Sequence, residues 1–215
     1  MNKLFRTALP LAAIAAVIAV PVIAQNSGPP GAPDKSRVAA GTYVADPGHT
    51  MVVWEVDHFG FSKYSGLFGD VAGTLTLDPA NPAASKVEVT IPVAKVTTAS
   101  AGLTGHLLRA GKDGGKPDFF GAAPADAKFV STSVVVDEDG DEAKVTGNLT
   151  LNGVTKPVTL DVEFHGAGTN PYNKKATVGF NAEATIKRSD FGIAYGIPAV
   201  SDAVELEIHA AFEKQ

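Results

Sequence analysis

The stretch NLTLNGVTKPVTLDVEFH, residues 148–165, decides the fold class of this chain. Apolar and polar residues alternate on both sides of Asn152-Gly153, which is the pattern of two strands that each bury one face. Asn-Gly tolerates the positive φ angles of a tight turn whose twist matches its flanking strands. The stretch therefore predicts a β-hairpin. Its apolar face consists of Leu149, Leu151, Val158, Leu160, Val162 and Phe164.

The same period of two recurs on both sides of the hairpin. We predict further strands over residues 41–45, 50–59, 66–77, 86–93, 128–136, 176–186 and 204–212, and the first strand of the hairpin extends over residues 144–151. Few helix-length connections separate these segments, which favours an antiparallel sheet of about eight long strands over a parallel α/β arrangement. Gly66, Gly69 and Gly73 indicate bends where the sheet curls, and curling suggests a barrel. The pattern alone leaves a closed barrel and a sandwich open.

One long excursion, about residues 98–125, interrupts the strands. Leu103, His106, Leu107 and Ala110 follow helical spacing and predict a short helix. Pro117 predicts the first turn of a second short helix that carries Phe119 and Phe120. Residues 111–116, GKDGGK, read as a flexible exposed loop between the two helices.

The first 24 residues have the features of a secretory signal peptide. Lys3 and Arg6 precede an apolar run that ends in small residues before Gln25. A membrane anchor is the alternative, but the apolar run is short for a bilayer. We expect residues 25–40, rich in proline and glycine, to be a disordered leader. Residues 41–215 are then long enough for one domain with one core.

Composition excludes several classes of function. The chain has no cysteine and a formal net charge of -5, so disulfides, thiol chemistry, iron–sulfur clusters and cysteine zinc sites are unavailable. The sequence contains no basic stripe with interleaved aromatic residues, which argues against a nucleic-acid-binding surface. An exported domain of this composition depends on its own apolar core for stability.

Six motifs together resemble one family. They are DPGHT (46–50), WEVDHFG (54–60), GLFG (66–69), His106-Leu107 with DFF (118–120), GNLTLNGVTKPV (147–158) and RSDFGI (188–193). In this order and over the whole domain they resemble the YceI-like family of exported lipid-binding proteins. The resemblance implies an all-β, eight-stranded antiparallel lipocalin-like barrel with one helical excursion. It also implies an apolar tunnel for a polyisoprenoid or similar fatty amphiphile, a periplasmic location and a homodimer.

The resemblance and the strand parity together suggest the ligand site. We expect these side chains to line the tunnel or its mouth: Trp54, Val56, His58, Phe68, His106, Leu107, Phe119, Phe120, Phe180, Arg188 and Phe191. Arg188 has two interpretations, a contact with a polar head group or a structural contact with Asp190 or a nearby carbonyl. Arg109, Lys112 and Lys116 are either solvated or meet an anionic head group. The excursion departs from the family pattern, with Leu103-Thr104-Gly105 before His106 and an insertion over residues 111–116.

We predict a binding and carrier protein without catalysis, cofactor or metal, which makes transient contact with a membrane. His49, His58 and His106 could ligate zinc, but their spacing matches no local metal motif. A periplasmic lipid hydrolase is an alternative, although Ser62, Ser65 and Ser189 lack a recognisable base partner. A second alternative is a solid-cored barrel that binds a protein partner through its long excursion.

Overall fold

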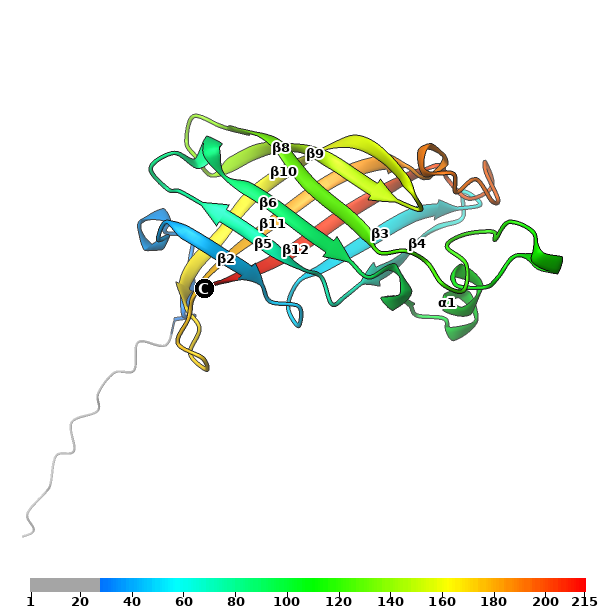
Figure 1. Ribbon diagram of the computed structural model, residues 1–215, viewed down its shortest axis with the longest axis horizontal. Helices are drawn as coiled ribbons and strands as arrows, with labels where there is room; N and C mark the ends of the chain where they lie inside the picture. Colours follow the sequence, from blue (N-terminus) through cyan, green and yellow to red (C-terminus); the bar gives the residue numbers. More distant parts are fainter. Residues whose placement is uncertain (1–27) are drawn as a thin grey trace, which may run out of the picture.

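The computed structural model describes residues 28–215, and the predicted signal peptide lies outside them. One sheet closes on itself as an antiparallel barrel (Figure 1). Its strands are β1 (Gly31–Ala32), β2 (Gly41–Ala45), β3 (Met51–His58), β4 (Ser62–Phe68), β5 (Ala72–Leu77), β6 (Lys86–Ile91), β7 (Val96–Thr98), β8 (Ala127–Val136), β9 (Glu142–Leu151), β10 (Val154–Thr169), β11 (Ala176–Lys187) and β12 (Ala203–Lys214). The helices between them are α1 (Ala101–Leu107) and the 3-10 turns η1 (Lys35–Arg37), η2 (Pro82–Ala84), η3 (Val93–Lys95), η4 (Lys112–Gly114) and η5 (Arg188–Phe191).

Eight long strands make the barrel wall, and three of them are each built from two pieces. β2 and β3 follow one another along the same edge of β12, where Ala45 pairs with Phe212 and Met51 with His209. In the same way β4 continues into β5, and β6 into β7. The breaks fall at residues 46–50, 69–71 and 92–95, where proline or glycine favours a bend over a continuous ladder. The predicted eight-stranded antiparallel barrel is confirmed.

The hairpin at residues 148–165 forms as its sequence predicts. Asn152 and Gly153 have φ angles of 52° and 78°, and Val154 pairs with Leu151 directly across the turn. Because side chains alternate between the two faces of a strand, this register turns the apolar residues of β9 and β10 into the barrel and the polar ones outward.

Two glycines let aromatic rings lie flat against the inner wall. A Cβ on Gly66 would stand 2.3 Å from the Trp54 ring, and a Cβ on Gly147 would stand 2.4 Å from the Phe129 ring. Such distances are far below van der Waals contact, so a larger residue at either position would displace the ring. These glycines therefore set where Trp54 and Phe129 lie along the wall.

The excursion completes the wall at one end of the barrel. β7 pairs with β4 within the described chain, whereas β6 is the strand that pairs with β8. Residues 99–126 occupy the interval between β7 and β8, and α1 lies at this end (Figure 1). Ser100 caps α1 by accepting a hydrogen bond from the Leu103 N–H, and the Phe120 N–H donates to the Leu107 carbonyl at 3.0 Å.

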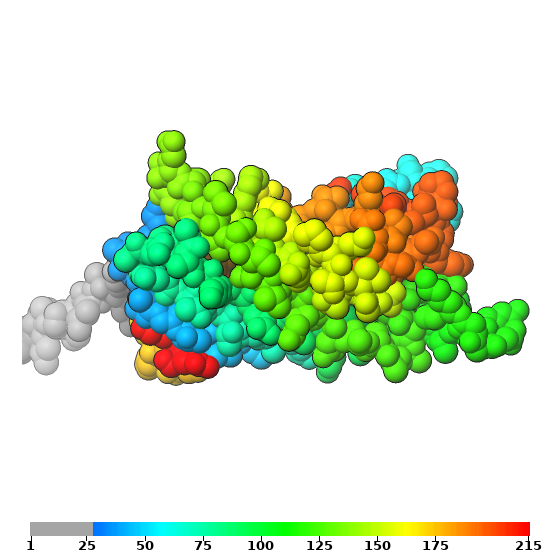
Figure 2. Space-filling view, turned by 45° about the horizontal axis from the view of Figure 1, so that its top comes forward, coloured from blue at the N-terminus to red at the C-terminus, as the bar shows by residue number. Residues whose placement is uncertain are grey.

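Two predictions about irregular segments are wrong. Pro117 starts no helix. Residues 118–120 form bends instead, and the Phe120 N–H donates to the Leu107 carbonyl rather than within a helical turn. The leader is not disordered in its described part, since β1 pairs with Gly168 and Ala167 of β10 and η1 follows directly. Residues 111–116 are largely exposed, as expected, and protrude from the end of the barrel (Figures 1 and 2). In residues 28–215 no helix has the length and apolarity needed to cross a bilayer.

Candidate functional site

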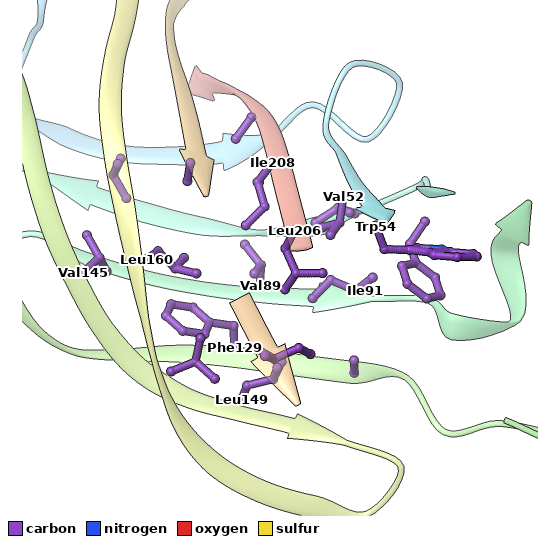
Figure 3. A pocket seen from close by; sticks show the side chains of 18 of the residues that line it. Val52, Trp54, Val89, Ile91, Phe129, Val145, Leu149, Leu160, Leu206 and Ile208 are labelled. Atoms are coloured by element: carbon purple, nitrogen blue, oxygen red, sulfur yellow. The ribbon is translucent and has the colours of Figure 1, made fainter. Parts of the chain in front are cut away.

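The interior of the barrel is a cavity rather than a filled core. Its volume is about 950 Å³, and every long strand of the barrel contributes apolar side chains to its wall. Figure 3 labels ten of these residues, among them Val52, Phe129 and Leu206. A barrel of eight strands is just wide enough either to be filled by its side chains or to hold a small or extended ligand. The solid-cored alternative is therefore wrong for this chain.

Most of the site residues predicted from the sequence lie in the cavity wall. Of the site residues predicted from the sequence, those that line the cavity are Trp54, Val56, His58, Phe68, His106, Leu107, Phe119, Phe120, Phe180 and Arg188. Phe191 does not line it. Its side chain is 1% exposed and packs with Phe129, Val145 and Leu149, which themselves line the cavity. That these residues contact a ligand stays a prediction.

The α1 end of the cavity is closed by aromatic side chains from three separate segments. His106 of α1 lies edge-to-face against Phe119, with ring centroids 5.2 Å apart, and against Tyr195, at 5.5 Å. Phe119 and Tyr195 are also 5.5 Å apart. Such pairs stabilise by about 0.5–1.5 kcal/mol each beyond the area they bury. We call His106, Phe119 and Tyr195 the mouth cluster.

Asp118 fixes the position of His106 in the mouth cluster. The Asp118 carboxylate lies 2.8 Å from His106 Nε2 and accepts a hydrogen bond from Arg109 at 2.9 Å. The hydrogen bond with His106, followed by that from Arg109, holds the pKa of Asp118 below its ordinary value. Arg109 is thus engaged by Asp118, and Lys116 donates to the Gly192 carbonyl at 2.9 Å.

Of the two interpretations of Arg188, the structure supports the structural role. Its guanidinium donates to four backbone carbonyls, those of Ser201, Ile193, Tyr195 and Val200, at 2.8 to 3.2 Å. The side chain is 6% exposed, and burial lowers its pKa, opposed by the charge of Asp202. Its partners are carbonyls and not Asp190. Arg188 thereby holds together the loop of residues 192–202, which carries Tyr195.

The opposite end of the cavity is covered by the N-terminal segment, which the sequence pattern had assigned to a disordered leader. Lys35 and Val38 line the cavity there. Lys35 forms an ion pair with Asp141 at 2.8 Å, at the tip of the β8–β9 hairpin. Tyr43, which is fully buried, donates its hydroxyl to the Ala39 carbonyl at 2.6 Å. We call residues 28–40 the N-terminal cover.

The histidines do not converge on a metal site. His49 is exposed and pairs with Asp46 before β3, whereas His58 ends β3, whose eight residues span about 25 Å as an extended strand. In the part of the chain that the structure describes, no group of three or more histidine, aspartate or glutamate side chains is placed to hold a metal ion.

The serines named for a hydrolase have other partners or none. Ser65 donates to Glu55 and Ser189 donates to Asp202. Ser62 pairs opposite His58 in the β3–β4 ladder. Across residues 28–215, no hydrogen bond joins a serine hydroxyl to a histidine ring, so the geometry gives the hydrolase alternative no support.

Comparison with known proteins matches this geometry to one family. The YceI-like domain family matches residues 43–212. Protein YceI of Escherichia coli O157:H7 is 43% identical over 175 residues, which cover 80% of this chain and 86% of that protein. The crystal structure of the Campylobacter jejuni YCEI protein superposes with a TM-score of 0.60 at 31% identity, covering 74% of this chain and 90% of that one.

A more distant structure shares the fold alone. It is a polyisoprenoid binding domain from Saccharophagus degradans implicated in plant cell wall breakdown, with a TM-score of 0.53 and 15% identity, covering 82% of this chain and all of that one. The barrel, the hairpin at residues 148–165 and the match across residues 43–212 agree, and this chain therefore belongs to the YceI-like family.

Proposed function

We propose that this protein binds and carries a long-chain polyisoprenoid or a similar fatty amphiphile, without catalysis. The observation that supports this most directly is the apolar cavity of about 950 Å³ along the barrel. Its wall is apolar in the middle, and charged residues lie towards its ends, with Lys35, Asp141 and Glu142 at one end and Arg188 at the other. A ligand with a long apolar chain and a small polar group fits such a space. The Saccharophagus degradans domain, described as polyisoprenoid binding, has the same fold.

The volume of the cavity gives the size of the chain. At about 30 Å³ for each water-sized group, as in a liquid, the cavity holds on the order of 30 such groups, or about six five-carbon units. Burial of about 0.8 kcal/mol per methylene gives roughly 3 to 4 kcal/mol for each unit, whereas association costs about 4 to 15 kcal/mol. One or two units would barely bind, while several units bind without a strong polar anchor. Chain length therefore dominates affinity.

The carrier acts outside the cytoplasm in this proposal. The charged and apolar pattern of residues 1–24 supports export to the periplasm. Fractionation by osmotic shock tests this directly, and recovery of full-length protein in the cytoplasmic fraction would overturn it. A homodimer also stays a prediction.

Native mass spectrometry of the mature protein, purified without detergent, tests the carrier function. A tryptophan at Ala182, which lines the cavity in the middle of β11, fills the tunnel, whereas a tryptophan at Glu183 projects outward from the same strand. We expect a stoichiometric isoprenoid or fatty species on the wild type and on Glu183→Trp, and at least a tenfold smaller ligand-bound fraction on Ala182→Trp. A wild-type mass without ligand, unchanged after incubation with polyprenyl lipids, would overturn the proposal.

A further inference from the structure

Three exposed aromatic side chains gather at the α1 end of the barrel. Phe61 is 90% exposed, Phe59 53% and Tyr195 50%. The β3–β4 turn carries the two phenylalanines and is bound to the loop of Tyr195, since the Phe59 N–H donates to the Ala199 carbonyl at 2.7 Å. Figure 2 shows the two segments side by side, cyan and orange, at one end of the molecule. We call Phe59, Phe61 and Tyr195 the aromatic rim.

The rim is continuous with the cavity. Phe59 and Tyr195 line the cavity and are half exposed at the same time, so the apolar wall runs from the interior to the outer surface at this end. The other large exposed apolar residues, Val135 and Tyr172, lie on β8 and in the β10–β11 turn. Neither belongs to the wall of the cavity. Exposed apolar residues that gather at one place mark an interaction surface, whereas single ones are ordinary.

The backbone holds the rim in an unusual conformation. Phe59 has a φ angle of 60°, a left-handed conformation that bulky side chains rarely adopt. Its neighbours fix it there, since Asp57 accepts a hydrogen bond from the Gly60 N–H at 2.7 Å and the Phe61 N–H donates to the His58 carbonyl at 3.1 Å. The turn thus holds its two phenylalanines in a defined geometry, with Phe61 almost fully exposed and Phe59 about half exposed.

The charges near the rim are balanced. Lys112, Asp113 and Lys116 lie on the excursion at this end, and Asp190 lies in η5, two residues before Gly192, whose carbonyl accepts from Lys116. These charges give the rim no strong electrostatic attraction to anionic lipid, so a bilayer contact here would depend mainly on its apolar side chains. Aromatic side chains prefer the interface between the headgroups and acyl chains of a bilayer.

We propose that the aromatic rim docks onto the surface of a lipid bilayer and places the mouth of the tunnel against the lipid phase. A water-insoluble chain can then pass between bilayer and cavity along a continuous apolar path. The bilayer contact would let the proposed carrier load its ligand. Only this biological purpose rests on the proposed function, because binding to vesicles is measured independently of any ligand.

Flotation of the mature protein with phosphatidylcholine vesicles tests the proposal. Phe61 does not line the cavity, so Phe61→Ser changes the rim and leaves the tunnel intact. We expect Phe61→Ser to lower the vesicle-bound fraction at least threefold and Phe61→Trp to raise it, a gain that misfolding would not produce. Tyr172→Ser, which removes an aromatic residue that is 93% exposed away from the rim, is the matched control and should bind as the wild type does. Replacing one fifth of the lipid with phosphatidylglycerol should change binding less than twofold.

The outcomes separate docking from carriage. Equal flotation of Phe61→Ser and the wild type, or an equal loss in Tyr172→Ser, would overturn the docking surface. Light scattering on the same variants tests a second copy of the chain as the occupant, and a dimer that Phe61→Ser converts to monomer would also overturn it. Native mass spectra of Phe61→Ser should keep the ligand of the wild type. If vesicles bind through Phe61 but no variant ever holds a lipid, the carrier function fails and the docking surface stands.

Discussion

The two ends of the tunnel are closed by different means. At the N-terminal end, the cover is held by backbone pairing of β1 with β10, by the ion pair of Lys35 with Asp141 and by the hydroxyl of Tyr43. At the α1 end, aromatic side chains meet edge-to-face, and a single carboxylate, Asp118, holds the histidine. Side-chain contacts rearrange on nanosecond to microsecond timescales without breaking a strand ladder. For the proposed carrier function, we therefore expect the ligand to enter at the α1 end.

The largest effect on stability should come from replacing Arg188, whose guanidinium binds the loop at the α1 end. Arg188→Met leaves four buried or half-buried carbonyls without a donor. Each unpaired buried group costs about 1–3 kcal/mol, so we expect the free energy of unfolding to fall by about 3 kcal/mol or more. Urea denaturation measures this change. A loss below about 1 kcal/mol would show that the loop of residues 192–202 holds itself together without the guanidinium.

A single substitution at the N-terminal end of the tunnel should lower the free energy of unfolding by less. Tyr43→Phe removes the hydrogen bond to the Ala39 carbonyl and keeps the buried ring. We expect a loss of about 1 kcal/mol in urea denaturation, together with faster hydrogen exchange of the amides in residues 28–40. Tyr195→Phe is the matched control at the other end and should leave that exchange unchanged. Unaltered protection in Tyr43→Phe would mean that the β1 ladder alone secures the cover.

The smallest effect on stability should come from Asp118, since its side chain is one-third exposed. Its pKa is lowered in the folded protein, so the stability it contributes is present above the ordinary value of 3.8 and is lost as the pH falls through the lowered value. We expect ligand release to accelerate over that range below pH 4, and Asp118→Asn to release ligand faster at neutral pH. Carboxyl NMR titration gives the pKa. A pKa at or above 3.8 would contradict the tie between Asp118 and His106.

The sequence predicted the wall of the tunnel better than its ends. Alternation fixes which face of a strand each residue occupies, so Trp54, Val56 and Phe180 could be placed without coordinates. The ends depend on where loops meet. Nothing in the local pattern brings Tyr195 to His106, or directs the guanidinium of Arg188 to carbonyls that lie up to 13 residues along the chain.

The N-terminal cover was missed for a related reason. Residues 28–40 have the proline and glycine content of a linker, and a two-residue strand such as β1 leaves no period to detect. Its order comes from long-range partners, Gly168 and Asp141 among them. Phe191 packs against residues of the cavity wall without lining the cavity, and a 3-10 turn offers no alternation from which to predict this. The breaks within the long strands did have a signal, in Pro47, Gly69 and Pro92.

The position of Trp54 over Gly66 has a practical consequence. Trp54 is the single tryptophan among 215 residues, it lines the cavity, and its indole N–H is buried without a hydrogen-bond partner in the described structure. Its fluorescence therefore arises from one apolar site beside the tunnel. The wild-type protein carries its own optical reporter of tunnel occupancy, so loading and release can be followed in real time without an attached dye.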